Sequence, residues 1–388
     1  MGFLHNPQLL WWRKAIFQIH LWVGIALCLY LVVIGITGSI LVFESEIEHA
    51  AYPQLWRAPA PSASSGNREA DLADVIACVK HAYPGRFITA AYVPDKPGDN
   101  FEAFLYRDGQ SLYVFADPQS GRIVGTLDPD ASWLIWIINL HFRLLAGHTG
   151  LILNGLGAAG LLILCLTGLV VWWVGLHRWM RGLKVNLRAG WKRINFDLHS
   201  AVGFWTLAVV SMWAFTGVYF VWPHPIESAV NHFSSIASAR PPVFTVPLHE
   251  NNAGWADLRP MVHQAQLSSP NASFAGAFFP RNSQGALTLL MARGDPRNFS
   301  HMDYVYFDPV TSQQLAIWHR GLNSTWGASF IFWLSPLHFG MDWGLLIKIL
   351  WAVLGCSLSL LSMTGVLMYW NRSLSKQWNS IRNRVVVR

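Results

Sequence analysis

The hydrophobic positions of the chain gather in four long runs that are separated by more polar stretches. These runs cover roughly residues 16–43, 149–175, 199–222 and 343–370. Each run is long enough to cross a bilayer as a helix, which takes about 20 apolar residues. The two longest polar stretches, about 45–130 and 224–322, are each large enough for a small core. The pattern predicts a membrane protein, mainly α, with four transmembrane helices and α+β outer domains.

Each of these polar stretches begins with helical spacing and continues with strand-like runs. In the first stretch, a linker rich in Pro, Ala and Ser at 58–66 comes before the predicted elements. These are a helix at 70–81 and strands at 87–93, 101–107, 112–116 and 122–126. The second predicts a helix at 256–266 and strands at 273–279, 286–292 and 304–307. Segments 113–118 and 304–309 both read Tyr-Val, two further residues, then Asp-Pro. We therefore expect one α+β plan to occur twice.

The basic residues indicate how the chain is oriented in the membrane. Arg13 and Lys14 precede the first run, six Lys or Arg residues lie between 178 and 193, and five lie between 372 and 388, with no acidic residue in the latter two segments. Segments rich in Lys and Arg stay on the cytoplasmic side. Both termini are then cytoplasmic and both outer domains face the opposite side. Topology accounts for the net charge of +7, so we expect no nucleic-acid partner.

Two aromatic stretches, 133–138 and 330–334, are too short to cross the membrane and suit helices at its surface, where Trp is favoured. The expected organisation, in chain order, is a tail and first transmembrane helix at 1–44, an outer domain at 45–131, an interfacial helix and second transmembrane helix at 132–176, a basic loop at 177–195, a third transmembrane helix at 196–222, a second outer domain at 223–322, an interfacial helix and fourth transmembrane helix at 323–370, and a basic tail at 371–388.

Short motifs recur at matching places in the two halves. A His-x-x-x-Gly motif contains His20 in the first half and His199 in the second, and a Leu-His-Phe motif contains His141 and His338. Thr-Gly dipeptides follow within the apolar runs, at Thr37, Thr167, Thr216 and Thr364. Ionisable residues within a membrane are costly and usually mark function. Four histidines at duplicated places suggest a site built on a two-fold axis between the halves.

These histidine motifs and the repeated Tyr-Val-x-x-Asp-Pro segments resemble the PepSY-associated transmembrane family over nearly the whole chain. The resemblance implies two duplicated halves, each with a PepSY-like periplasmic domain. It also implies a place in the inner membrane of Gram-negative bacteria, where some members are ferric-siderophore reductases of the ferrioxamine type. Some members carry b-type haem. No Cys-x-x-Cys-His motif occurs in the sequence, so covalent c-type attachment is excluded.

A b-type haem needs two axial donors on opposite faces of the ring, and imidazole is a suitable donor. His20 and His199 open spans that run outward, whereas His141 and His338 precede spans that run inward. Histidines of equal depth can share one iron, which predicts His20 with His199 and His141 with His338 as axial ligands of two b-type haems. The alternative for any one histidine is an interfacial hydrogen-bonding role.

Other residues near the outer pair have candidate roles. His148 lies seven residues after His141, on the same face if the helix is continuous, and could replace it as a ligand or hydrogen-bond to it. Arg143 is placed for a haem propionate. Arg13, Lys14, Lys192 and Arg193 could serve the inner haem, although topology alone explains them. We expect His177, in the basic loop, to be solvated.

The expected function is therefore a di-haem reductase that passes electrons across the inner membrane to ferric iron in a periplasmic siderophore, with a hydroxamate favoured as the chelator. No Gly-x-Gly-x-x-Gly follows a predicted strand, so the donor is a quinol or a cytoplasmic reductant rather than a nicotinamide bound to this chain. Two alternatives remain: a haem-free transporter whose histidines relay protons, and a regulatory membrane protein whose outer domains bind periplasmic partners.

Overall fold

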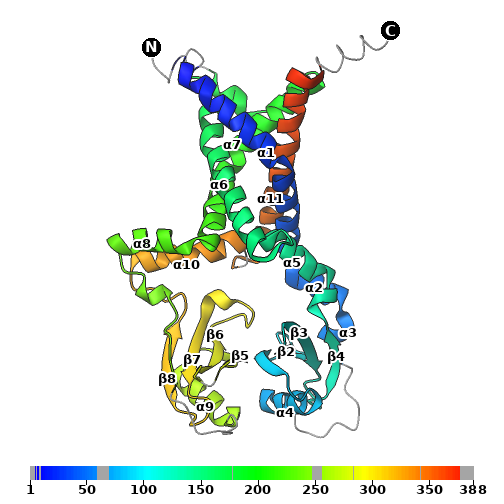
Figure 1. The fold of residues 1–388 in the computed structure, drawn as a ribbon, viewed down its shortest axis with the longest axis vertical. Coiled ribbons are helices and arrows are strands. Elements are labelled where there is room, and N and C mark those ends of the chain that lie inside the picture. Colours follow the sequence, from blue (N-terminus) through cyan, green and yellow to red (C-terminus); the bar gives the residue numbers. More distant parts are fainter. Residues whose placement is uncertain are drawn as a thin grey trace. The chain divides into compact units, whose positions relative to one another are not determined.

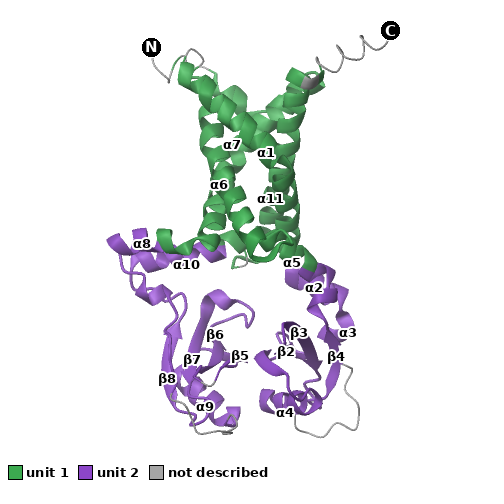
Figure 2. Cartoon of the chain, in the orientation of Figure 1, with its two compact units in different colours: residues 1–43, 136–226, 337–388 green, residues 44–135, 227–336 purple. Residues whose placement is uncertain are grey.

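The computed structural model describes residues 5, 7, 10–58, 70–176, 178–246, 256–282, 284–340 and 342–375. The chain divides into two compact units, coloured separately in Figure 2. We call residues 1–43, 136–226 and 337–388 the bundle unit, and residues 44–135 and 227–336 the sheet unit. The expected linker beyond Ala58, His177 and the basic tail beyond Ser375 lie outside the described residues.

Four long helices, which lie side by side in Figure 1, form the bundle unit: α1 (Trp11–Leu41), α6 (Gly147–Trp172), α7 (Trp191–Val221) and α11 (Gly344–Tyr369). All four are long and apolar enough to span a membrane, which confirms the four predicted spans. α1 and α7 begin earlier than expected because the aromatic and basic residues before each apolar run also adopt helix. His20 and His199 therefore lie well inside their helices rather than at the start.

Small side chains allow α1 and α11 to approach closely. A Cβ on Gly35 would lie 2.8 Å from the carbonyl oxygen of Gly355, which no side chain could tolerate without a shift. Serine hydroxyls cross the same contact: Ser39 donates to the Ala352 carbonyl at 2.9 Å and Ser362 donates to the Cys28 carbonyl at 2.7 Å. Close backbone approach with polar cross-links is typical of helices packed in lipid.

A short helix precedes α6 and another precedes α11. These are α5 (Trp133–Arg143) and α10 (Trp326–Phe339), which contain the aromatic stretches 133–138 and 330–334 and are helical as expected. The chain breaks between α5 and α6, where Leu144, Leu145 and Gly147 have φ values of 47°, 58° and 56°. Gly340, at the end of α10, has a φ of 68°, and a Cβ there would lie 2.5 Å from the Trp351 ring. Glycine is required at that turn by both conformation and space.

The sheet unit contains the predicted strands in a single antiparallel sheet. Its order is β4-β3-β2-β1-β5-β6-β7-β8. The strands are β1 (Phe87–Tyr92), β2 (Phe101–Arg107), β3 (Gln110–Ala116), β4 (Ile123–Leu127), β5 (Ser273–Phe278), β6 (Leu287–Ala292), β7 (Met302–Phe307) and β8 (Gln314–His319). The sequence analysis missed β8, which begins with the partly buried Gln314, ends with the exposed His319 and has only a weak alternation.

The two outer domains expected from the sequence instead form one continuous unit. β1 pairs with β5, and Ala91 lies opposite Ala277 at this central junction. Each half alone would leave β1 or β5 as an unpaired edge, and pairing the two edges satisfies their backbone groups.

Helices α4 (Leu72–Ala82) and α9 (Leu258–Ser268) pack on one face of this sheet through one shared core. Asp71 and Asp74 form a capping box at the start of α4. Arg259 of α9 bonds both carboxylates, at 2.7 Å and 2.6 Å, and so links the two helices. The remaining helical segments are α2 (Glu44–Ala51), α3 (Pro53–Trp56), α8 (Pro223–Phe233) and the short turns η2 (Pro129–Ala131), η3 (Trp179–Leu183), η4 (Ala237–Ala239), η5 (Phe299–His301) and η6 (Trp370–Leu374).

Candidate functional site

The bundle unit brings His20 of α1 together with His199 of α7. Their ring centres lie 6.4 Å apart and their planes cross at 87°. Both side chains are partly buried among the helices. The pairing agrees with the one expected from equal depth in the membrane.

The spacing of this pair fits a metal ion between the two rings. A metal–imidazole bond is about 2.0 Å long and the ring centre lies about 1.1 Å behind the nitrogen, so two imidazoles on opposite sides of one ion have centres about 6.2 Å apart. Among the described residues, no group of three or more His, Cys, Asp or Glu side chains is arranged to hold a metal. A pair of ligands suits haem, because the porphyrin supplies the other four nitrogens and the protein supplies only the two axial donors.

The second predicted pair, His141 of α5 and His338 of α10, also lies within the bundle unit. Aromatic side chains surround them: Phe220 lies 5.1 Å from the His338 ring, and Phe142 stacks on Phe339 at 6.4 Å. The surroundings are therefore apolar, as a haem ring requires.

The two pairs lie at opposite ends of the bundle. His141 bonds Thr37, which lies seventeen residues after His20 on α1. At 1.5 Å per residue, this places the pairs about 26 Å apart along the helix axis. Each pair therefore forms its own site, and no histidine of one pair can share an ion with the other.

Each of the four histidines is bonded through Nδ1 to a threonine of a neighbouring helix. The His20 ring bonds Thr167 at 3.1 Å, and the His199 ring bonds Thr364 at 3.0 Å. The distances for the other pair are 2.9 Å from His141 to Thr37 and 2.6 Å from His338 to Thr216. These are the four Thr-Gly dipeptides of the sequence. The sequence analysis singled them out as a repeat but gave them no role; their fourfold occurrence was the signal that could have assigned one.

The glycine of three of these dipeptides lies against the histidine ring. A Cβ on Gly168 would lie 3.1 Å from Cε1 of His20, and a Cβ on Gly38 would lie 3.0 Å from Cε1 of His141. The corresponding distance from Gly365 to His199 is 3.4 Å. Gly217 differs, because it faces Ala158 rather than His338. The absent side chains give the imidazoles room to reach their threonines.

Side chains at matching positions of α6 and α11 hold the ends of α5 and α10. Asn154 donates to the carbonyl of His141 at 2.8 Å, and its own carbonyl oxygen accepts from Tyr30 at 2.8 Å. In the second half, Trp351 donates to the carbonyl of Leu337 at 2.9 Å. Chemically different residues thus satisfy the last carbonyls of both short helices and fix the backbone beside each histidine.

His148 does not share a continuous helix with His141. The break after α5 places it in the first turn of α6, where its side chain is exposed. The face relationship that made it an alternative ligand is therefore absent. Arg143 lies in the last turn of α5 and is also exposed, two residues from His141, so it remains the candidate for a propionate there.

Among the basic candidates for the other site, Arg13 is engaged by the bundle. Its guanidinium donates to the Val171 carbonyl at 2.6 Å, at the end of α6, while its Nε has no partner among the described residues. Arg193 pairs with the buried Asp197 at 2.8 Å, so the acidic residue nearest His199 in α7 is already neutralised. Lys14 and Lys192 are exposed.

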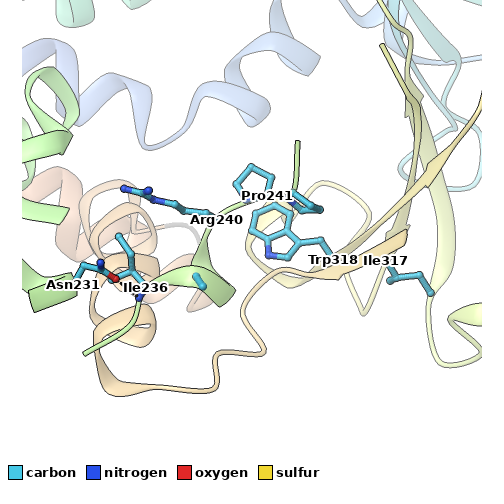
Figure 3. A pocket seen from close by; sticks show the side chains of 8 residues that line it. Asn231, Ile236, Arg240, Pro241, Ile317 and Trp318 are labelled. Atoms are coloured by element: carbon cyan, nitrogen blue, oxygen red, sulfur yellow. Dashed lines mark hydrogen bonds between the residues drawn. The ribbon is translucent and has the colours of Figure 1, made fainter. Parts of the chain in front are cut away.

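The sheet unit has a shallow pocket of about 580 Å³. Figure 3 shows Arg240 and Trp318 on its lining. Arg240 pairs with Glu227, and the Trp318 indole donates to the Ser238 carbonyl at 2.9 Å. None of the predicted site residues lines this pocket.

Fold and site together define a multi-pass membrane protein with two pairs of histidines in a four-helix bundle. The family model of the PepSY-associated TM region matches residues 17–372, and the chain belongs to that family. The chain is also similar to the uncharacterized protein PA4219 of Pseudomonas aeruginosa, with 37% identity over 86 residues. That match covers 21% of this chain and 20% of the relative, so the chain matches about a fifth of that relative's length.

Proposed function

We propose that the protein is a di-haem reductase of the inner membrane that delivers electrons to ferric iron in a periplasmic siderophore. The observation that carries the proposal is the presence of two histidine pairs at opposite ends of the bundle. In one of these pairs, the ring centres of His20 and His199 lie 6.4 Å apart. When bound, haem would supply reversible one-electron chemistry between ferric and ferrous iron. The axial ligands would be His20 with His199 and His141 with His338.

The other residues determine the surroundings in which electrons pass between the two sites. In this proposal the apolar lengths of α1, α6, α7 and α11 keep water away from the path between the two sites. The phenylalanines around His338 do the same at the second site. In this proposal the basic segments keep both termini in the cytoplasm, so the sheet unit is periplasmic and the His141–His338 pair serves the outer side.

The substrate in this proposal is a ferric chelate, and a hydroxamate is favoured by the family resemblance. One electron reduces iron(III) to iron(II), which hard oxygen ligands hold less tightly, so the chelate releases it. The electron comes from a quinol or a cytoplasmic reductant. The helices that carry His141 and His338, α5 and α10, also carry the exposed aromatic residues Trp133 and Trp326, which are the contacts proposed for the chelate.

A spectroscopic experiment tests this function directly. Purified protein should show a Soret band with reducible α and β bands, and a pyridine haemochrome assay should give two b-type haems per chain. The reduced protein, freed of dithionite, should be reoxidised by a ferric hydroxamate, with iron(II) appearing in a trap in matching amount.

The alternatives predict other outcomes. A haem-free transporter or a regulatory protein would show no Soret band. A cytochrome with another partner would stay reduced with several ferric chelates and be reoxidised by a quinone. Either result would contradict the siderophore assignment.

A further inference from the structure

The threonines bonded to the four histidines have already used their only hydroxyl proton. Each donates to a carbonyl of its own helix, four residues earlier: Thr37 to Val33 at 2.7 Å, Thr167 to Ile163 at 2.6 Å, Thr216 to Met212 at 2.9 Å and Thr364 to Leu360 at 2.7 Å. A hydroxyl that donates elsewhere can only accept at its remaining lone pair. The proton of each His–Thr bond must therefore come from Nδ1 of the imidazole.

A backbone carbonyl gives the same answer independently for His199. Its Nδ1 lies 3.0 Å from the carbonyl oxygen of Leu361 as well as 3.0 Å from Thr364. A carbonyl oxygen has no proton to give, so Nδ1 is the protonated nitrogen of His199.

We propose that Thr37, Thr167, Thr216 and Thr364 are positioning residues that hold the histidines in the Nδ1–H tautomer and leave the Nε2 lone pairs free to bind iron. This inference rests on the proposed haem ligation and extends it. In a neutral imidazole one nitrogen donates and the other accepts, so fixing the proton on Nδ1 fixes the acceptor at Nε2. The second bond of the hydroxyl, to its own helix, fixes the direction of the ring.

The threonine bonded to each histidine also affects how basic the imidazole is as an iron ligand. Metal-bound histidines commonly donate to a carboxylate, a carbonyl or water, and a carboxylate makes the imidazole more basic. A neutral threonine withdraws the proton far less, so the imidazoles stay close to neutral donors. Replacing a threonine by aspartate should therefore stabilise ferric iron and lower the midpoint potential of that haem alone.

The threonine bonds also join helices in two sets of three. They link α1 to α6 through His20, α7 to α11 through His199, α5 to α1 through His141 and α10 to α7 through His338. In every case the histidine and its threonine lie on different helices. The ligand direction therefore depends on helix packing as well as on the local rotamer.

The test compares Thr364→Val, which removes the hydroxyl but keeps the shape, with Thr364→Ser, which keeps the hydroxyl. Thr206→Val is a matched control, because Thr206 is buried on α7 and makes the same bond to its own helix, to Val202 at 2.8 Å, while bonding no histidine of the described residues. The readouts are the rate of haem transfer to apomyoglobin, the low-spin ferric EPR signal and the midpoint potential.

We expect Thr364→Val to weaken haem retention by about 10-fold or more at the His20–His199 site, which is the usual effect of losing a bond to a metal-bound histidine. Its EPR signal should broaden, and Thr364→Ser should restore both properties. Thr206→Val should behave as the parent protein. If Thr364→Val and Thr206→Val are indistinguishable in all three readouts, the positioning role is overturned.

A further measurement does not depend on haem. In haem-depleted protein labelled with ¹⁵N-histidine, the shifts of His199 should report a protonated Nδ1 and a bare Nε2, and Thr364→Val should mix the tautomers. A protonated Nε2 in the parent would overturn the proposal. Failure to reduce a ferric chelate would instead contradict only the proposed function, so the two failures are distinguishable.

Discussion

The imidazole of His20 lies edge-on to the imidazole of His199, 6.4 Å away centre to centre, although the two residues belong to different halves of the chain. This separation lies within the range of edge-to-face rings, about 4.5–7 Å. It is also close to the spacing of two imidazoles that bind one ion from opposite sides, about 6.2 Å. The pair takes one histidine from each half, so each half alone supplies only one of the two rings.

The double variant His20→Ala/His199→Ala should lose little more haem than either single variant. Each alanine variant should lose about one of two haems, and the double variant should lose the same one, because two ligands of one iron act as a unit. Haem per chain and reduced-minus-oxidised spectra measure this. A double variant without haem, beside single variants that each lose half, would reject the shared site.

Alanine at Gly38 should disturb the His141–His338 site. The added Cβ would lie 3.0 Å from Cε1 of His141, so the ring must move or lose its bond to Thr37. Overpacking of this kind costs about 1–3 kcal/mol. We expect loss of about half of the haem, from this site alone, by the same assay.

Gly24→Ala is the matched control for Gly38→Ala on α1. Its Cβ would meet only Leu164, at an ordinary 3.7 Å, and alanine favours helix. It should keep both haems. Equal haem loss in the two variants would mean that helix α1 tolerates no alanine there, and the steric argument about His141 would be wrong.

The sheet unit should become less stable as the pH rises from about 5 to 8. Burial raises the pKa of the Glu102 carboxyl to about 7 despite its ion pair with Arg297. The native state then holds a proton that the unfolded state, with an ordinary pKa of 4.5, has lost. The stabilisation is fully present below that ordinary value and disappears as pH passes 7, with a slope of at most about 1.4 kcal/mol per pH unit.

Thermal unfolding of the whole protein across this pH range measures the effect. Glu102→Gln should flatten the dependence. Part of it should persist, because burial also raises the pKa of Glu48 to about 7. A stability that rises with pH in the parent would show that the Arg297 charge outweighs burial and holds Glu102 ionised.

The orientation of the chain can be checked with reporters. Fusions within 371–388 should give a fluorescent cytoplasmic reporter and an inactive periplasmic phosphatase, because that segment has five basic residues and no acid. A fusion in the β3–β4 turn, at Gln119, should give the opposite result. Phosphatase activity at the C-terminal fusion would mean that the C-terminus is periplasmic, which would contradict the proposed direction of electron flow.

The elements of the fold were predictable where one periodicity dominates. The β2 bounds were predicted as observed, and the spans were found because hydrophobicity over 20 residues is unambiguous. The union of two sheets was not predictable. It depends on contacts between β1 and β5, which are far apart in sequence, and neither strand carries a local sign of its partner.

The part of the site that was predictable from the sequence rested on the repeated histidine motifs and on the depth of each histidine in the membrane. The His20–His199 pairing follows from equivalent positions on two spans that run in the same direction, and the structure brings these rings together. The role of His148 depended on a continuous helix, and the left-handed residues Leu144 and Leu145 remove that condition. Leucine gives no local warning of such a turn, since it rarely adopts this conformation. The Thr-Gly repeat was visible in the sequence, but which histidine each threonine contacts depends on helix packing.

The central junction of the sheet has a consequence for biosynthesis. β1 emerges from the ribosome long before β5, and α6 and α7 must be made and inserted between them. During that interval the first four strands have an open edge of the kind that templates aggregation. A truncated chain ending after the first half would expose this edge permanently. Gene fragments that encode one half should therefore yield insoluble or chaperone-bound protein, and co-expression of both halves should rescue assembly.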